Sequence, residues 1–312
     1  MKTGIYLSYV GLGANLLHLS YCHQVARKYG PVTIITLCKN LESALADDPL
    51  IEKVFYINKY HKKLIDIFNL AKVLKSFDFK NLLVFYPSIR LYLSAKLAGI
   101  KNVSIYNIFK KKNLHLVRAA KKLTEDFLQI NNCPTETNFF INKDELKKIN
   151  KEYIGSKFKI VIGAGSSGPT TRWGSKNFSE LINHLNKSDD YFFFILCGPN
   201  EKQIENEIIS NLNKQNYISL SDKNIKESIP YLCASDMYVG NDSFGSHITS
   251  QSGKKSIIML LDSPKAYTDY SKNYHRMVPN GFNIEKITHG TNADPNLITV
   301  EEVIKTINQL RS

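Results

Sequence analysis

The chain has 312 residues, of which 43% are apolar and 22% charged; this is an ordinary globular composition that excludes a disordered, fibrous or collagen-like chain. Lys and Arg number 41 against 28 Asp and Glu, and the net charge of +13 favours anionic partners, although the lysines are scattered and solubility alone explains them equally well. The longest apolar stretches, such as Tyr191–Leu196, are far shorter than the roughly 20 residues of a membrane span.

The first half of the sequence alternates short apolar runs with helical patterns. Strands are predicted at Ile5–Val10, Pro31–Leu37, Val54–Ile57, Asn81–Tyr86 and Val103–Tyr106, and helices at Asn15–Tyr29, His61–Ser76 and Ser88–Ala98. Continuous apolar runs bounded by turn residues indicate strands that are buried on both faces, as in parallel sheets. The first run is interpreted as a strand and not as a signal peptide, because no small-residue cleavage pattern follows it.

The alternation breaks and then restarts in the second half. Helices are predicted at His115–Ile130, Lys143–Tyr153, Ser175–Asn186, Glu201–Asn213, Ile225–Cys233, Ser246–Gly253 and Thr299–Leu310, and strands at Lys159–Gly163, Tyr191–Cys197, Tyr217–Leu220, Met237–Gly240 and Lys255–Leu260. Thr299 stands at the N-cap of the last helix, with Glu302 at the capping-box position. Strand–helix alternation predicts a doubly wound α/β fold in two domains, residues 1–150 and 151–312, with a cleft between them.

The five cysteines indicate a reducing compartment, most simply the cytoplasm. They are Cys22, Cys38, Cys133, Cys197 and Cys233. An odd number without a CxxC pair provides neither zinc spacing nor a disulfide framework.

Ligands in open α/β folds bind at the carboxyl edge of the sheet, so the strand-to-helix turns are the candidate sites. The first turn, Gly11–Asn15, is either an anion-binding helix start or an ordinary glycine turn with Asn15 as the N-cap. The third glycine of a dinucleotide fingerprint is missing, since Leu16 stands in its place.

Two turns of the second half carry groups suited to phosphate. The stretch Gly163–Trp173 combines small and hydroxylated residues with Arg172, whose forked donors match phosphate oxygens. The single tryptophan, Trp173, is interpreted as a packing residue. In the turn Gly198–Glu201 a structural role is favoured, with a ligand contact by Glu201 as the alternative.

The turn Gly240–His247 carries the strongest functional signal. Asp242, Ser243 and His247 stand close together between a strand and a helix of small residues. Ser243 and the free amides of a helix start suit phosphate, and His247 can donate a hydrogen bond or a proton. The alternative is structural, with Asp242 as a helix cap.

These motifs resemble glycosyltransferase family 9, the ADP-heptose:lipopolysaccharide heptosyltransferases, over most of the chain. The similar stretches are the glycine loop Gly11–Gly13, the run Phe77–Gly99, Thr171–Leu181, Leu196–Glu201, Ile225–Asp236 and Asn241–His247, the last being the most specific. The resemblance implies a GT-B fold of two Rossmann-like domains, an acceptor-binding one at residues 1–150 and a nucleotide-sugar-binding one at residues 151–312. It also implies transfer of heptose from ADP-heptose to a lipopolysaccharide-type glycan, with inversion and without a metal or cofactor.

The resemblance assigns residues to the two substrates. Those expected at the donor are Thr170, Thr171, Arg172, Glu201, Asp242, Ser243, Gly245 and His247, and those expected on the acceptor side are Gly13, Asn15 and Arg90. Arg172 is expected to act in catalysis by stabilising the leaving diphosphate. The expected partners are therefore a nucleotide-diphospho-sugar and an anionic glycan or glycolipid, with peripheral contact at the inner membrane surface.

The sequence departs from the family pattern at the catalytic base. The family carries an Asp directly after the amino-terminal glycine, where this chain has Ala14 and then Asn15. His18 is the candidate base, and a structural histidine is the alternative. In the signature turn Phe244 replaces a glycine, and Gly174 replaces the proline after Trp173.

A non-catalytic nucleotide-sugar-binding protein of the same fold is the alternative function, because the Asp base is missing. Nucleic-acid binding through the positive charge is a weaker reading, since the sequence has no clustered basic stripe and no stacking-aromatic motif.

Overall fold

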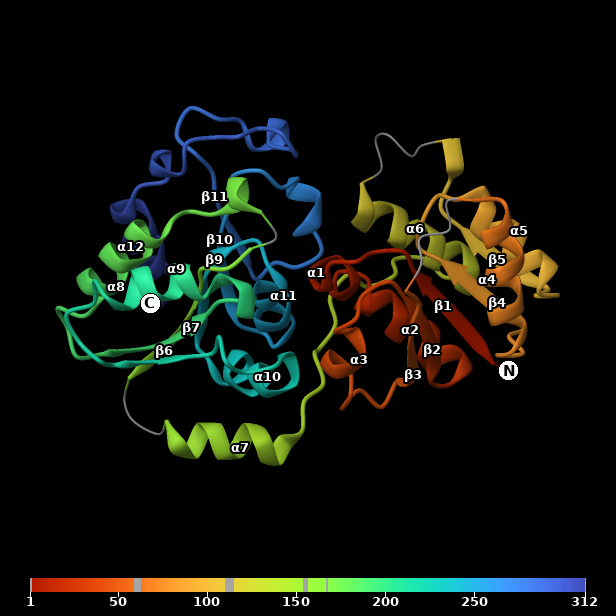
Figure 1. The fold of residues 1–312 in the computed structure, drawn as a ribbon, viewed down its shortest axis with the longest axis horizontal. Helices are drawn as coiled ribbons and strands as arrows, with labels where there is room; N and C mark the ends of the chain where they lie inside the picture. The colour runs from red at the N-terminus through yellow and green to blue at the C-terminus, as the bar shows by residue number, and fades with distance from the viewer. Residues whose placement is uncertain (1, 59–62, 110–114, 154–156, 167, 312) are drawn as a thin grey trace. The chain divides into compact units, whose positions relative to one another are not determined.

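The computed structural model describes residues 2–58, 63–109, 115–153, 157–166 and 168–311. They form two compact units, Met1–Phe140 (unit 1) and Ile141–Ser312 (unit 2), each with one parallel sheet between helices, as expected of a doubly wound α/β fold (Figure 1). The division lies ten residues before the expected one at 150/151, and helix α7 (Lys143–Glu152) packs against α10 (Ile225–Ala234) of unit 2.

The sheet of unit 1 has the strand order β3-β2-β1-β4-β5, and all of its pairs are parallel. Its strands are β1 (Thr3–Leu7), β2 (Val32–Thr36), β3 (Ile51–Tyr56), β4 (Asn81–Val84) and β5 (Asn102–Ile105). The chain adds β2 and β3 on one side of β1 and β4 and β5 on the other. The direction of winding therefore reverses between β1 and β4, where doubly wound folds open a crevice at the carboxyl edge.

Two helix pairs cover this sheet. Helices α2 (Leu19–Tyr29) and α6 (Leu116–Leu128) pack together, and α4 (Ile65–Lys75) and α5 (Ile89–Leu97) pack side by side over a core that includes Leu70, Leu82 and Leu91. The short helices α1 (Leu12–Leu16) and α3 (Leu41–Ala44) were not predicted separately. His61, the expected start of α4, lies outside the described residues.

The sheet of unit 2 has the order β11-β10-β9-β6-β7-β8, again with parallel pairs. Its strands are β6 (Phe158–Gly163), β7 (Tyr191–Leu196), β8 (Tyr217–Ser219), β9 (Met237–Asn241), β10 (Lys255–Met259) and β11 (Tyr274–Met277). The sequence did not predict β11, because this edge strand is short and only its first residue is fully buried. The reversal of winding lies between β6 and β9.

The helices of unit 2 form two groups. Helices α8 (Ser175–Leu185), α9 (Lys202–Ile209) and α12 (Val300–Arg311) enclose one core with the sheet, while α10 packs against α7 and α11 (Phe244–Gln251). Single 3₁₀ turns are η2 (Pro169–Thr171), η3 (Pro199–Glu201), η4 (Lys265–Tyr267), η5 (Ile284–Lys286) and η6 (Pro295–Leu297). The predicted capping box of α12 is confirmed, since the Thr299 amide donates to Glu302 and the Glu302 amide donates to Thr299 Oγ1.

The helices of the described residues include none that is both long enough and apolar enough to cross a bilayer.

Two glycines set the geometry at the reversal point of unit 2. Gly163 ends β6 and is paired with Gly240 on β9. A Cβ on Gly240 would lie 2.4 Å from the carbonyl oxygen of Gly163, and a Cβ on Gly163 would lie 1.8 Å from the hydroxyl of Tyr238. The two backbones therefore approach each other more closely here than any larger residue allows, and the space beside them is filled by the Tyr238 ring.

We expect Gly240→Ala to destabilise unit 2 by about 1–3 kcal/mol, because the obstructing atoms belong to the backbone and cannot rotate away. Gly168→Ala is the matched control: its backbone is extended and its Cβ would meet nothing within 4 Å. Thermal unfolding of both variants and the parent chain measures the difference. Equal melting temperatures for the two variants would contradict the close approach.

Candidate functional site

The candidate site lies at the carboxyl edge of the unit 2 sheet, around the reversal between β6 and β9. The loop after β6 runs through η2 to Trp173, the turn after β7 forms η3, and the turn after β9 leads into α11. Because the strands are parallel, all three loops leave the sheet at the same edge. The sequence-predicted donor residues fall in these three loops and in the first turn of α11.

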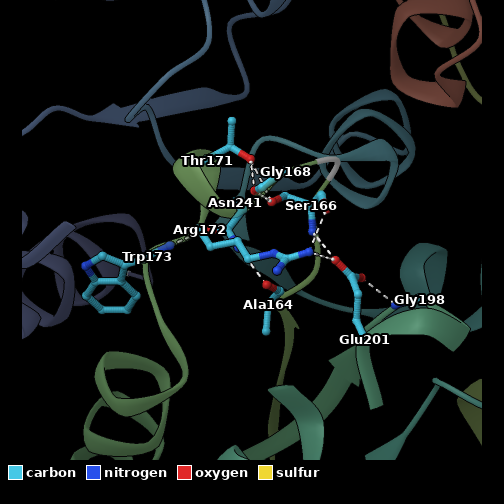
Figure 2. A network of polar contacts seen from close by, with 9 residues as sticks. All are labelled: Ala164, Ser166, Gly168, Thr171, Arg172, Trp173, Gly198, Glu201 and Asn241. Atoms are coloured by element: carbon cyan, nitrogen blue, oxygen red, sulfur yellow. Dashed lines mark hydrogen bonds and ion pairs between the residues drawn. The ribbon is translucent and has the colours of Figure 1, made fainter. Parts of the chain in front are cut away.

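The Arg172 guanidinium is the permanent positive charge of this edge. Its Nη2 donates to Glu201 Oε1 at 2.9 Å and to the carbonyl oxygen of Ser166 at 3.3 Å. Figure 2 shows the side chain pointing toward these two residues and away from Trp173. These two hydrogen bonds fix the direction of the Arg172 side chain. Because 30% of the side chain remains exposed, it is still open to a ligand.

Glu201 holds the loops after β6 and β7 together. Its Oε1 accepts from the Ser166 amide as well as from Arg172, and its Oε2 accepts from the Gly198 amide at 2.7 Å (Figure 2). With both oxygens used inside the protein, Glu201 positions Arg172. The structure does not present it as a direct contact of the donor.

Asn241, to which the sequence analysis gave no role, ties the Arg172 loop to the end of β9. Its Oδ1 accepts from the Trp173 amide at 2.8 Å, and its Nδ2 donates to the carbonyl oxygen of Ala164 at 2.7 Å. The side chain is fully buried. A polar residue at the end of an apolar strand was the signal in the sequence that could have identified Asn241.

Trp173 packs edge-on against Phe178 in the core, as expected, and its Nε1 donates to the Ile298 carbonyl.

The hydroxyls of the two predicted threonines differ in availability. Thr171 is buried, and its Oγ1 donates to the Gly168 carbonyl and lies 2.7 Å from Ser166 Oγ, so it shapes the loop. Thr170 is exposed and donates to Asp262 Oδ2 at 2.7 Å. Asp262 was missed by the sequence analysis because it follows β10 in a stretch without a recognisable motif.

The first turn of α11 supplies backbone donors at the same edge of the sheet as Arg172. Ser243 is the N-cap residue, and its side chain makes no capping bond to the helix but pairs with the Tyr238 hydroxyl at 3.0 Å. The first amides of a helix lack intrahelical partners and carry the positive end of its dipole. Gly245 lies in the same turn, and a Cβ at this position would lie 2.5 Å from Leu196. Packing against Leu196 therefore explains the glycine without a contact to the donor.

Asp242 and His247 are both nearly buried and lie together. Asp242 Oδ1 is 3.7 Å from His247 Nε2, and His247 Nδ1 bonds to the Tyr270 hydroxyl at 2.8 Å. Burial lowers the pKa of His247 to about 3, so its imidazole is neutral and the pair is not an ion pair near pH 7. Burial raises the pKa of Asp242 to about 6, although a hydrogen bond from Ser263 and the charges of His289 and Arg276 oppose it.

In unit 1, the predicted acceptor-side residues are not gathered in one open site. Asn15 is buried inside α1 and is not an N-cap: its Nδ2 donates to the carbonyls of Tyr9 and Gly11, and its Oδ1 accepts from Thr36. Gly13 is a half-buried residue of the same helix. Arg90 is exposed in the first turn of α5.

His18 does not fit the role of a general base in this structure. Its side chain is fully buried, its Nδ1 lies 2.7 Å from the Ala14 carbonyl, and its Nε2 lies 2.8 Å from the Tyr106 hydroxyl. Tyr9 and Phe85 pack on its ring. Burial lowers the pKa of His18 to about 4 against the effect of the Ala14 hydrogen bond, so the ring is neutral. The structural interpretation of His18 applies.

Among the described residues, no group of three or more His, Cys, Asp and Glu side chains is arranged to hold a metal ion.

Comparison with known proteins connects this architecture to one family. The model of glycosyltransferase family 9 (heptosyltransferase) matches residues 99–286, which is more than half of the chain. No curated protein sequence matches the chain.

Solved structures resemble the whole chain. The ADP-heptose LPS heptosyltransferase II of E. coli matches with a TM-score of 0.75 at 15% identity, over 99% of this chain and 98% of that one. A family 9 glycosyltransferase from Veillonella parvula matches with a TM-score of 0.78 at 15% identity, over 99% and 97%. The E. coli heptosyltransferase WaaC with ADP gives 0.73 at 12% identity, over 99% of each chain. The fold is therefore the GT-B fold of these enzymes.

We expect Asp242→Asn to stabilise the protein above pH 6. Above pH 6 the Asp242 carboxylate is charged and buried in the native state, whereas the unfolded state exposes it to water. For a pKa raised from 3.8 to about 6, this lowers the free energy of unfolding by about 2–3 kcal/mol. The difference shrinks as the pH falls from 6 to 4, and below about pH 3 the carboxyl is protonated in both states and the difference vanishes. Urea unfolding at pH 8 and pH 4 measures it.

Asp262→Asn is the control with the opposite sign. Burial disfavours the charge of Asp262, but hydrogen bonds from Thr170 and the backbone around Thr291 outweigh it and hold the pKa below its ordinary value. This variant should lose stability at pH 8. If Asp242→Asn were also destabilising at pH 8, the buried-charge assignment would be wrong.

Proposed function

The chain belongs to glycosyltransferase family 9, and from that premise we propose that it transfers a heptose from ADP-heptose to a lipopolysaccharide-type or other glycan acceptor. The acceptor hydroxyl attacks the anomeric carbon with inversion, and no metal takes part. One observation carries this proposal: Arg172 is fixed by Glu201 and still exposed, beside a turn that leads into the start of α11.

The chemistry of the leaving group explains why this arrangement suits the transfer. Departure of a nucleoside diphosphate adds negative charge to its oxygens, and donors held in advance stabilise that charge without reorganising. Arg172 supplies a cation with a forked donor set, and the α11 amides supply dipoles. The hydrogen bond from the Trp173 amide to Asn241 Oδ1 joins the Arg172 loop to the end of β9, directly before the turn that leads into α11. Together they replace the positive charge that a metal supplies in other transferases.

The remaining donor residues divide into contacts and supports. Thr170 is exposed, Ser243 is half-buried and the nearly buried Asp242 keeps 8% of its side chain exposed, so we assign these three to direct contact with the donor. Thr171, Glu201, Gly245 and His247 act through packing and internal hydrogen bonds. Asp242, whose carboxylate accepts hydrogen bonds, is suited to hold a sugar hydroxyl.

The acceptor is an anionic glycan, and the exposed Arg90 of unit 1 is suited to its phosphate groups. We place the reaction in the cytoplasm. The five cysteines are all free and buried, which agrees with a reducing compartment.

A second candidate function is donor binding without transfer. It is favoured by Ala14, which has no proton acceptor, and by the enclosure of His18. An assay for transfer to a panel of saccharide acceptors separates the two: turnover of ADP-heptose supports the enzyme, while tight donor binding with neither transfer nor hydrolysis supports the binding protein.

We expect Arg172→Ala to lower kcat/KM about 100-fold, because one donor to the developing charge is lost. Steady-state kinetics with ADP-heptose, and calorimetry with ADP, GDP and UDP, measure the effect and the choice of nucleotide. Lys176→Ala removes an equally charged but highly exposed group at the start of α8 and should change little. Equal kinetics for the two variants, or no binding of any nucleotide, would contradict the proposal.

Glu201→Gln tests the positioning of Arg172. The glutamine keeps the shape but cannot accept from all the amides that the carboxylate serves, so we expect a smaller loss of kcat/KM than for Arg172→Ala. Because both changes act through one guanidinium, the double variant should be little worse than Arg172→Ala alone. Additive losses would show that Glu201 acts independently.

A further inference from the structure

The loops that follow β10 and β11 carry polar side chains to which the proposed function gives no role. They span residues 260–273 and 278–299. All strand pairs of this sheet are parallel, so both loops leave at the same edge as the loops of the candidate donor site. The strand order β11-β10-β9-β6-β7-β8 puts them on one side of the α11 start and the turn that bears Glu201 on the other.

The Asp262 carboxylate fastens these two loops to the loop after β6. Its Oδ2 accepts from the Thr170 hydroxyl at 2.7 Å, and its Oδ1 accepts from the Thr291 amide at 2.8 Å. The Thr291 side chain closes a tight turn, because its Oγ1 accepts from the Thr288 amide at 2.9 Å. His289 lies inside this turn and is therefore tied, through Asp262, to Thr170, an assigned donor contact.

Tyr267 holds the His289 ring in place. The Tyr267 hydroxyl is hydrogen-bonded to His289 Nε2 at 3.1 Å, and the ring centroids are 5.7 Å apart. An ion pair between Lys265 Nζ and Glu285 Oε1, at 2.5 Å, joins the same two loops a second time. Tyr267 is half-buried and His289 is exposed, so the pair is both ordered and accessible.

The Tyr267–His289 pair interacts with Asp242. Ser263, in the loop that carries Tyr267, hydrogen-bonds to the Asp242 carboxylate. Burial, and next the charge of Asp242, raise the pKa of Tyr267, while the charge of His289 opposes the rise that burial causes in the pKa of Asp242. A carboxylate, a phenol and an imidazole are thus grouped on the β10 side of the α11 start.

These three groups suit a ligand that carries several hydroxyls. A carboxylate only accepts hydrogen bonds, whereas a phenol and a neutral imidazole can both donate and accept. A sugar hydroxyl also donates and accepts, so each of the three groups can pair with one. A diphosphate is unsuited to the same place, because it would lie against the negative charge of Asp242.

We propose that Tyr267 and His289 are specificity-determining residues that bind hydroxyl groups of the transferred sugar, on the β10 side of the diphosphate. The proposal rests on the proposed function and deepens it, since it names residues that distinguish a sugar-bearing donor from the bare nucleotide. Arg172 binds the part that ADP and ADP-heptose share. The Tyr267–His289 pair contacts only the part that ADP lacks.

Calorimetry with ADP and with ADP-heptose tests the proposal, because the two ligands differ only in the sugar. Tyr267→Phe combined with His289→Ala should raise the Kd of ADP-heptose about tenfold or more, since two hydrogen bonds to the sugar are lost. The Kd of ADP should stay within about twofold of the parent value. Melting temperatures show whether the variant is folded like the parent.

The matched control is Tyr217→Phe combined with His184→Ala. Tyr217 is a half-buried tyrosine at the start of β8, and His184 is an exposed histidine in the last turn of α8. Because helices of parallel α/β units run antiparallel to the strands, both residues lie at the opposite edge of the sheet. Neither Kd should change in this variant.

Three results would overturn the proposal and leave the proposed transferase function standing. Equal losses for ADP and ADP-heptose would assign the pair to the nucleotide. No loss for either ligand, or the same loss in the control variant, would remove the pair from the donor site. A parent chain that does not bind ADP-heptose would instead overturn the proposed function, and this proposal with it.

Discussion

The hydrogen bonds accepted by the Glu201 carboxylate are the interactions on which the proposed donor site depends. The carboxylate accepts from the amides of Gly198 and Ser166 and from the Arg172 guanidinium, so one side chain joins the loops that follow two neighbouring strands. A lone arginine on a loop would sample many rotamers, and ordering it at the moment of binding would cost free energy. Here the side chain is already ordered in the folded protein, and 30% of it remains exposed for an anion.

The close approach of Gly163 and Gly240 provides the frame for that contact. It lets β6 and β9 lie side by side at the reversal of winding, and Asn241 then bonds across to Ala164 and the Trp173 amide. Each of these links is buried or half-buried and belongs to unit 2 alone. The proposed donor site is therefore held together by contacts within unit 2.

The sequence predicted the fold well because its signals are periodic and local. Apolar runs such as Tyr191–Leu196 became buried central strands, and the Thr299–Glu302 pair became a capping box. Strand β11 escaped detection, since a four-residue edge strand with partly exposed side chains has no such signal. The boundary between the units followed the packing of α7 on α10, a contact distant in sequence.

The sequence was less informative about the site, because residue type does not reveal burial or partners. Arg172 and Asp242 stand where the motifs placed them. His18 has the right chemistry for a base but is closed between Ala14 and Tyr106, and Asn15 is held by Tyr9, Gly11 and Thr36. Asn241 and Asp262 have structural importance that no short motif conveys.

A crystal structure of the protein soaked with ADP tests the central claim most directly. The account predicts the diphosphate within hydrogen-bond distance of the Arg172 guanidinium and of the first backbone amides of α11, with the contact between Arg172 and Glu201 retained. A diphosphate bound elsewhere, with Arg172 still turned to Glu201 and touching no phosphate oxygen, would contradict it.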